Sequence, residues 1–157
     1  MPKPENDVFI LEKGLIEREL TLRKLRLPPD AKVTRKALLR WVALSLGLIS
    51  PGESRDAVLP VLDGLFNFHV KRRGASVSEL MDFMAAQGYE VNEKTLRYQL
   101  MKLRDQGLVE KKENVYSFVK APFSDDLKAG IFLVLDSTYS DTKGRLEEAF
   151  SSLFSQY

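Results

Sequence analysis

The stretch from Ser76 to Gly107 constrains the fold most, because it holds two helix start signals separated by a short turn. Ser76 and Glu79 have the spacing of a capping box, and Asn92 is of a type that caps helix N-termini. Gly88 stands between the two helices, where glycine readily closes a helix in the left-handed conformation. The sequence therefore predicts two helices joined by a compact turn and not by a flexible linker.

The second of these helices, predicted over residues 92–106, has one apolar face and one basic face. Its apolar residues lie within about 60° of arc at 100° per residue, so they form a face that is buried on folding. The opposite side carries basic, aromatic and methionine side chains. The apolar set is Leu96, Leu100 and Leu103, and the opposite side is centred on Lys94, Arg97, Tyr98, Met101 and Asp105.

After Gly107 the hydrophobic period changes from that of a helix to that of a strand. Two short runs of β-forming residues, 108–110 and 115–118, flank the polar residues 111–114. The sequence therefore predicts a hairpin directly after the basic helix.

Two further helices are predicted before this unit. Residues 7–26 carry leucines at helical spacing after the capping residue Asn6, and the prolines at 28 and 29 end the run. A second helix from about Thr34 contains Trp41, which we expect in the core, and has an almost wholly apolar second half. Such a helix needs cover on more than one side, from the first helix or from another subunit.

Residues 121–157 form a third helical region. Ser124 is its predicted cap, and two apolar stripes fit either two helices or one long interrupted helix. A cluster of helix-breaking residues at 50–54 marks a boundary. We therefore expect a mainly α fold with a small β-hairpin, made of an N-terminal helical region 1–53, a central unit 54–120 and a C-terminal helical region 121–157.

The central unit resembles a winged helix-turn-helix domain, the fold shared by many bacterial and archaeal transcription regulators. The resemblance covers roughly residues 55–120, and its most characteristic piece is SVSELMDFMAAQGYEVNEKTLRYQLMKLRDQGLVEKKENVYSF. It implies that residues 92–106 form a recognition helix for the major groove of DNA. It also implies that residues 110–114 form a wing that reaches an adjacent groove or phosphates.

Carried over by position, the resemblance implies a set of DNA contacts. Arg97 is the expected base contact, because its planar fork can bond guanine at two points. Tyr98 suits a phosphate or a thymine methyl group. The implied groove residues are Lys94, Arg97, Tyr98 and Met101, the implied phosphate contacts are Lys102 and Arg104, and the implied wing residues are Lys111 and Lys112.

The formal charge is nearly balanced overall but uneven along the chain. The net charge of +2 means that no field of the whole molecule favours nucleic acid or a membrane. Residues 18–40 carry +6 (eight basic, two acidic), residues 71–120 carry +3 (ten and seven), and residues 121–157 carry −3 (three and six). The basic stretch at 18–40 either extends a DNA-contacting surface or is the solvated face of two helices.

The modest charge of residues 71–120 affects which oligomeric state we expect. A unit of +3 binds DNA weakly, because affinity grows with the number of phosphates that are neutralised. We therefore expect a homodimer, formed through the terminal helices, with two copies on one duplex. Either the helix predicted over residues 7–26 or the C-terminal region 121–157 can form the dimer interface. Packing of the same leucines within one protomer is the alternative.

Residue types missing from the chain exclude several function classes. There is no cysteine and only one histidine, so disulfides and thiolate metal sites are excluded and a histidine metal site is not expected. No nucleotide-binding, serine-hydrolase or zinc-protease motif is found, so we expect no enzymatic activity and no cofactor. The N-terminus lacks the pattern of a signal peptide, and the apolar runs are too short for a bilayer. We therefore expect an intracellular, cytoplasmic protein without membrane contact.

The resemblance favours sequence-specific binding of double-stranded DNA by a transcription regulator. Winged helices also serve as protein interaction modules in larger assemblies, and fold alone does not choose between the two uses. A DNA replication or segregation protein is a further alternative.

Overall fold

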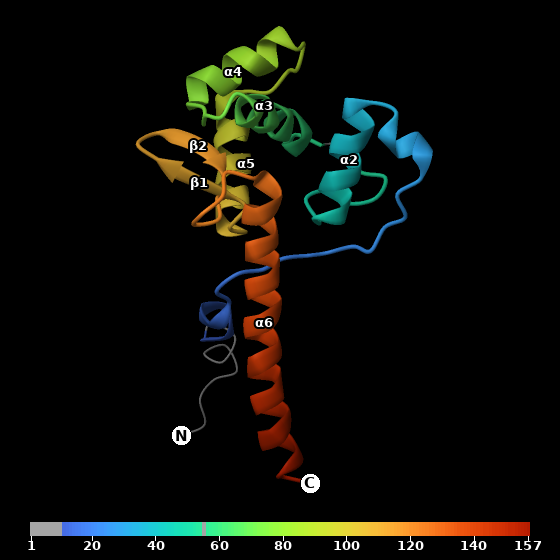
Figure 1. Ribbon diagram of the computed structural model, residues 1–157, viewed down its shortest axis with the longest axis vertical. Helices are drawn as coiled ribbons and strands as arrows, with labels where there is room; N and C mark the ends of the chain where they lie inside the picture. The colour runs from blue at the N-terminus through green and yellow to red at the C-terminus, as the bar shows by residue number, and fades with distance from the viewer. Residues whose placement is uncertain (1–10, 55) are drawn as a thin grey trace.

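The fold consists of helices and one small β-hairpin, which confirms the predicted class. The computed structural model describes residues 11–54 and 56–157. Most helices gather with the hairpin into a body, and the last helix projects from it (Figure 1). In chain order the elements are η1 Pro29–Lys32, α2 Arg35–Ser45, α3 Val58–Val70, α4 Val77–Ala86, α5 Glu93–Asp105, β1 Val109–Lys112, β2 Val115–Phe118 and α6 Leu127–Phe154.

Both predicted helix starts in the central unit are confirmed. The Ser76 hydroxyl accepts a hydrogen bond from the Glu79 N–H at 3.1 Å, and the Glu79 carboxylate accepts one from the Ser76 N–H at 3.1 Å. This second bond, and then the guanidinium of Arg73, lower the pKa of Glu79. The Asn92 side chain accepts a hydrogen bond from the Thr95 N–H at 2.8 Å. Local sequence therefore decides where α4 and α5 begin.

The core lies where α3, α4 and α5 meet. Gly64 of α3 lets α4 come close, because a Cβ at this position would lie 2.9 Å from Cδ2 of Leu80. Each fully buried aliphatic side chain contributes about 1.5–3 kcal/mol relative to an exposed one. The predicted leucines of α5 are all part of this core. The largest fully buried hydrophobic side chains are Val61, Leu80, Met84, Leu96, Leu100 and Leu103.

The hairpin follows α5 and is anchored to the segment between α3 and α4. Its antiparallel pairing leaves a two-residue turn, Glu113–Asn114, so the first half of the predicted loop 111–114 belongs to β1. Ala75 exchanges two backbone hydrogen bonds with Tyr116, at 2.9 and 2.8 Å. Gly74 permits this approach, because a Cβ there would lie 2.7 Å from the Tyr116 carbonyl oxygen.

The predicted helix over residues 7–26 is wrong for most of its length. Helix is found at residues 11–15, and the chain then runs without regular structure through residues 16–28, a segment that we call the strap. The predicted cap Asn6 lies outside the described residues. In Figure 1 the strap crosses α6 and continues towards η1 and α2.

Contacts with the end of α2 explain why the strap is not helical. The Arg23 N–H donates to the Ser45 carbonyl at 2.9 Å, and the Arg23 guanidinium donates to the carbonyls of Leu44 and Ile49 at 2.9 and 2.7 Å. The indole N–H of the partly buried Trp41 donates to a strap carbonyl at 2.7 Å. Two of these acceptors, Leu44 and Ser45, belong to the last turn of α2, where the carbonyls have no partners further along the helix. The strap is therefore the cover that the apolar half of α2 needs.

The C-terminal region is one uninterrupted helix, α6. Its cap is Asp126, whose side chain accepts a hydrogen bond from the Lys128 N–H at 3.0 Å. The predicted cap Ser124 instead accepts a hydrogen bond from the Asp126 N–H, one step before the helix. Gly130 lets α6 meet the exit of the hairpin, because a Cβ there would lie 2.1 Å from the Val119 carbonyl oxygen.

A buried carboxylate connects α2, α3 and the turn before α5. Asp63 of α3 is 2% exposed, and its Oδ2 accepts a hydrogen bond from the Tyr89 hydroxyl at 2.9 Å. The Arg35 guanidinium at the start of α2 lies 3.4 Å from the same oxygen. Burial, and then the hydrogen bond with Asp63, raise the pKa of Tyr89. The contact is structural, because a buried charge is tolerated only with such partners.

We predict that Asp63→Ala lowers the free energy of unfolding by about 1–3 kcal/mol, because it leaves the Tyr89 hydroxyl without its acceptor. Asp63→Asn keeps an acceptor and is expected to cost less than the alanine variant, since Arg35 is largely solvated. Urea unfolding measures both. Asp82→Ala, on the exposed surface of α4, is the matched control and should change stability by less than about 0.5 kcal/mol. Equal losses in Asp63→Ala and Asp82→Ala would contradict the structural role.

Candidate nucleic-acid interface

The outward face of α5 carries the predicted DNA contacts, and the fold leaves all of them exposed. Tyr98 is 54% exposed and Met101 is 47% exposed, although both side chains have large apolar parts. Such exposure at the centre of a charged helical face is what a binding surface provides. The predicted contacts exposed on this face are Lys94, Arg97, Tyr98, Met101, Lys102 and Arg104, and the acidic Asp105 is exposed among them.

The opposite face of α5 holds the helix in place. Leu96 and Leu100 are fully buried, and Leu103 is almost so. Contacts with α3, α4 and β1 surround this face. Because the buried leucines fix the rotation of α5 about its axis, the direction of its outward side chains is also fixed.

Weak local contacts order the outward side chains without occupying them. The Arg97 Nε lies 3.6 Å from a carboxylate oxygen of Glu93, one helical turn earlier. An exposed pair of this kind contributes about 0.3–0.5 kcal/mol, so Arg97 can exchange it for a stronger partner. The Lys102 ammonium lies 5.5 Å from the centre of the Tyr98 ring.

Lys111 and Lys112 are exposed on β1, immediately before the turn of the hairpin. Successive strand residues point to opposite faces, so the two lysines do not form one patch. Lys111 stands opposite Tyr116 in the register, with its ammonium 5.6 Å from the centre of that ring. Lys112 stands opposite Val115 on the other face. Both predicted wing lysines therefore lie on the hairpin, one on each face.

Acidic side chains make the charge around the two ends of α5 unequal. At the C-terminal end of α5, Lys102 and Asp105 line a depression together with Glu17 and Glu19 of the strap. The depression also holds Arg18, so its three carboxylates outnumber its two cationic side chains, and this excess disfavours a phosphate beside Lys102. The Glu110 carboxylate accepts a hydrogen bond from the Lys120 N–H at 3.2 Å. Both halves of α5 carry a net positive charge, and the carboxylates of the strap reduce it around the C-terminal half.

Much of the basic stretch at 18–40 serves intramolecular contacts. Arg40 lies 3.3 Å from an Asp56 carboxylate oxygen and also donates to the Glu53 carbonyl at 3.2 Å. Charge counting missed this role, because the acceptors are carbonyl, carboxylate and hydroxyl groups that only the fold brings near. The arginines used in this way are Arg18, Arg23, Arg35 and Arg40.

Lys36 is a basic residue that the fold moves closer to the candidate interface. It is exposed on α2, and its ammonium lies 5.7 Å from the centre of the Tyr89 ring. Tyr89 belongs to the turn directly before α5. Lys36 and α5 are far apart in the sequence, so the sequence alone does not predict that they lie close together.

The turn of the hairpin contains a strained residue. Glu113 and Asn114 have φ angles of 50° and 64°, as both positions of a tight two-residue hairpin turn require. Asparagine tolerates this region, whereas glutamate is disfavoured by about 1 kcal/mol. Glu113 also places a negative charge beside the lysines of β1.

We predict that Glu113→Gly raises the free energy of unfolding by about 0.5–1 kcal/mol, because glycine adopts a positive φ without steric cost. Glu113→Ala is the matched control, since it removes the same carboxylate and keeps the strain. Thermal or urea unfolding of both variants measures the difference. If the alanine variant is stabilised as much as the glycine variant, backbone strain is not the cause.

Comparisons with known proteins were made with family models, with curated proteins and with solved structures. Nothing matches this chain in any of the three. In the described ranges, 11–54 and 56–157, no helix combines the length and apolar character that crossing a membrane requires. The function is therefore inferred from the chemistry and geometry of the exposed side chains.

Proposed function

We propose that this chain binds double-stranded DNA by placing the N-terminal half of α5 in the major groove, as a regulator of transcription. The observation that carries the proposal is the outward face of α5, where Lys94, Arg97, Tyr98 and Met101 are exposed together above a fully buried leucine face. A helix of about 10–12 Å diameter fits a groove about 12 Å wide.

Each side chain has a role that its chemistry supports. The Arg97 guanidinium leaves its weak pair with Glu93 and bonds guanine at two points. Lys94 and Arg104 neutralise phosphates on either side, while Tyr98 and Met101 offer apolar contact to thymine methyl groups. Lys102 is the least suited of the set, because of the acidic depression that it lines.

The hairpin supplies the second point of contact. Its turn follows α5 closely in sequence, and the exposed Lys111 and Lys112 flank it. Because these lysines point to opposite faces of the hairpin, the hairpin contacts phosphates with one of them at a time. Backbone contacts of this kind position the protein without reading bases.

We predict that affinity for a mixed-sequence duplex falls steeply as salt rises, because bound phosphates release counterions. Arg97→Ala should cost about 1–3 kcal/mol at a preferred site. Lys111→Ala should weaken binding to all duplexes and reduce the slope of log K against log salt by about one. Fluorescence anisotropy across a salt series measures both effects.

Lys13→Ala is the matched control for these variants. Lys13 is exposed, lies before the strap and belongs to neither α5 nor the hairpin, so its loss should leave the slope unchanged. Absence of binding to any duplex near about 50 mM salt would contradict the proposal, since electrostatic binding is strongest there. That result would favour the alternative function, a protein interaction module in a larger assembly.

We also predict that Glu113→Gly and Glu113→Ala both raise affinity for duplex DNA, by about two- to threefold at low salt, because each removes a carboxylate from the tip of the hairpin. The effect should shrink as salt rises. Asn114→Gly alters the same turn without changing charge and should leave affinity as it is. Unchanged affinity in both Glu113 variants would place the hairpin away from the phosphates.

A further inference from the structure

The N-terminal end of α2 lies against the turn that leads into α5. The Arg35 guanidinium donates a hydrogen bond to the side-chain oxygen of Gln87 at 3.4 Å and lies 3.4 Å from the Asp63 carboxylate. The Lys36 ammonium lies 5.7 Å from the centre of the Tyr89 ring. Gln87 is the C-cap of α4, and Tyr89 follows it in the turn. Contacts from two successive residues therefore hold the start of α2 at this turn.

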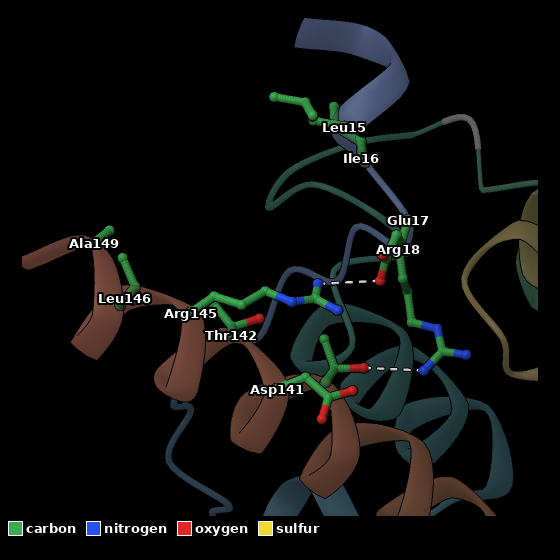
Figure 2. A pocket seen from close by; sticks show the side chains of 10 residues that line it. Leu15, Ile16, Glu17, Arg18, Asp141, Thr142, Arg145, Leu146 and Ala149 are labelled. Carbon is green, nitrogen blue, oxygen red and sulfur yellow. Dashed lines mark hydrogen bonds and ion pairs between the residues drawn. The ribbon is translucent and has the colours of Figure 1, made fainter. Parts of the chain in front are cut away.

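The fold uses the eight basic residues of the stretch 18–40 in two ways. Four of the five arginines form intramolecular bonds, as Arg18 does with the Thr138 hydroxyl of α6 at 3.1 Å (Figure 2). The lysines are exposed, and within the ranges 11–54 and 56–157 none of them forms an ion pair. Their charge is therefore available to a partner. These lysines are Lys24, Lys32 and Lys36.

Lys36 is the lysine of this stretch that a contact places beside α5. Tyr89 is three residues before Asn92, the cap of α5, and three residues of extended chain span at most about 11 Å. The Tyr89 side chain is held by its hydroxyl, which donates a hydrogen bond to Asp63 at 2.9 Å. Because the ring is held in this way, the Lys36 ammonium that packs on it has a defined place near the N-terminal end of α5.

We propose, on the basis of the function proposed for α5, that Lys36 binds a phosphate of duplex DNA beside the N-terminal end of α5. The helix α2 is then part of the DNA-binding surface. A helix in the major groove has a sugar–phosphate backbone on each side, because the groove is only about 12 Å wide. A long lysine side chain next to the end of such a helix can reach the nearer backbone. Phosphate suits lysine, since an ammonium offers charge and rotatable donors and needs no fixed orientation.

The two residues at the start of α2 have different tasks in this arrangement. Arg35 bonds to Asp63 and Gln87, so it positions α2. Lys36 packs on a ring, which leaves the donors of its ammonium free for a phosphate. Glu90 is exposed in the same turn and lowers the positive potential there. We therefore expect one phosphate contact from this end of α2 and not a cluster of contacts.

A contact at this place complements the hairpin. Lys111 and Lys112 follow α5 in the chain, whereas Lys36 adjoins the turn before it. Phosphate contacts near both ends of a helix fix its orientation in the groove without reading bases. The helix α2 lies outside the residues 55–120 that resemble a winged helix-turn-helix domain, so the contact is an addition to that unit.

Lys24 provides the matched control, because it carries the same charge near the other end of α2. The N–H of its neighbour Arg23 donates to the Ser45 carbonyl at 2.9 Å. Ser45 ends α2, which has 11 residues and is about 16 Å long. Lys24→Gln therefore removes one charge from the same basic stretch, away from the turn before α5.

The slope of log K against log salt, measured by fluorescence anisotropy with the full chain and a mixed-sequence duplex, tests the contact. Lys36→Gln should reduce the magnitude of the slope by about 0.9, the value for one phosphate of duplex DNA. Lys36→Arg keeps the charge and should retain the slope of the wild type. Lys24→Gln should retain it as well.

The same series separates failure of the α2 contact from failure of the proposed function. If the wild type binds and Arg97→Ala weakens binding, but Lys36→Gln keeps the slope of the wild type, the α2 contact is overturned and the proposed function stands. An equal loss of slope in Lys24→Gln and Lys36→Gln also overturns the contact. If the wild type binds no duplex near about 50 mM salt, both are overturned.

The absence of cysteine from the chain permits a test of proximity that does not depend on affinity differences. Lys36→Cys, Lys24→Cys and Lys94→Cys are each labelled with a photoactivatable cross-linker and irradiated with the duplex. Cross-links from positions 36 and 94, with few from position 24, are expected. Cross-links from position 94 without any from position 36, or equal yields from positions 36 and 24, overturn the α2 contact. Cross-links from none of the three positions overturn the proposed function as well.

Discussion

The buried carboxylate of Asp63 is the constraint on which the relative positions of the elements depend. A charged oxygen that is almost fully buried is tolerated only with hydrogen-bonding partners, and these partners come from two other places in the chain. Tyr89 brings the turn before α5, and Arg35 brings the start of α2. The apolar contacts among α3, α4 and α5 supply most of the stability, but they are not directional. Asp63 adds a directional contact that ties the turn before α5, and more weakly the start of α2, to α3.

The sequence predicts α4 and α5 well, because their signals are local. A capping box and an asparagine cap act within one turn of helix, and the spacing of Leu96, Leu100 and Leu103 identifies the buried face without knowledge of its neighbours. The same spacing identifies the exposed face of α5. For this reason the candidate contacts on α5 are found by sequence alone. The structure removes none of them, but it makes Lys102 a less suitable DNA contact.

The strap is not predicted, because its determinants are distant in sequence. Leucines in residues 7–26 have helical spacing, yet Arg23 satisfies carbonyls at the end of α2, and this contact favours an extended chain. Lys111 and Lys112 are predicted on the hairpin, and the alternation that points them to opposite faces is a local property of a strand. The C-terminal region shows a different limit of sequence-based prediction. Its apolar residues fit two helices or one interrupted helix, and only the structure shows one continuous α6.

The distribution of charge along α5 determines which half of the helix can approach DNA under the proposed function. At its C-terminal end, Asp105 lies with Glu17 and Glu19, and the negative end of the helix dipole adds to their effect. At its N-terminal end the dipole is positive, and Lys94 and Arg97 outweigh Glu93. A phosphate backbone is therefore attracted more strongly to the N-terminal end than to the C-terminal end, where these carboxylates offset Lys102 and Arg104. This gradient favours insertion of α5 by its N-terminal half, with the strap and α6 held away from the duplex.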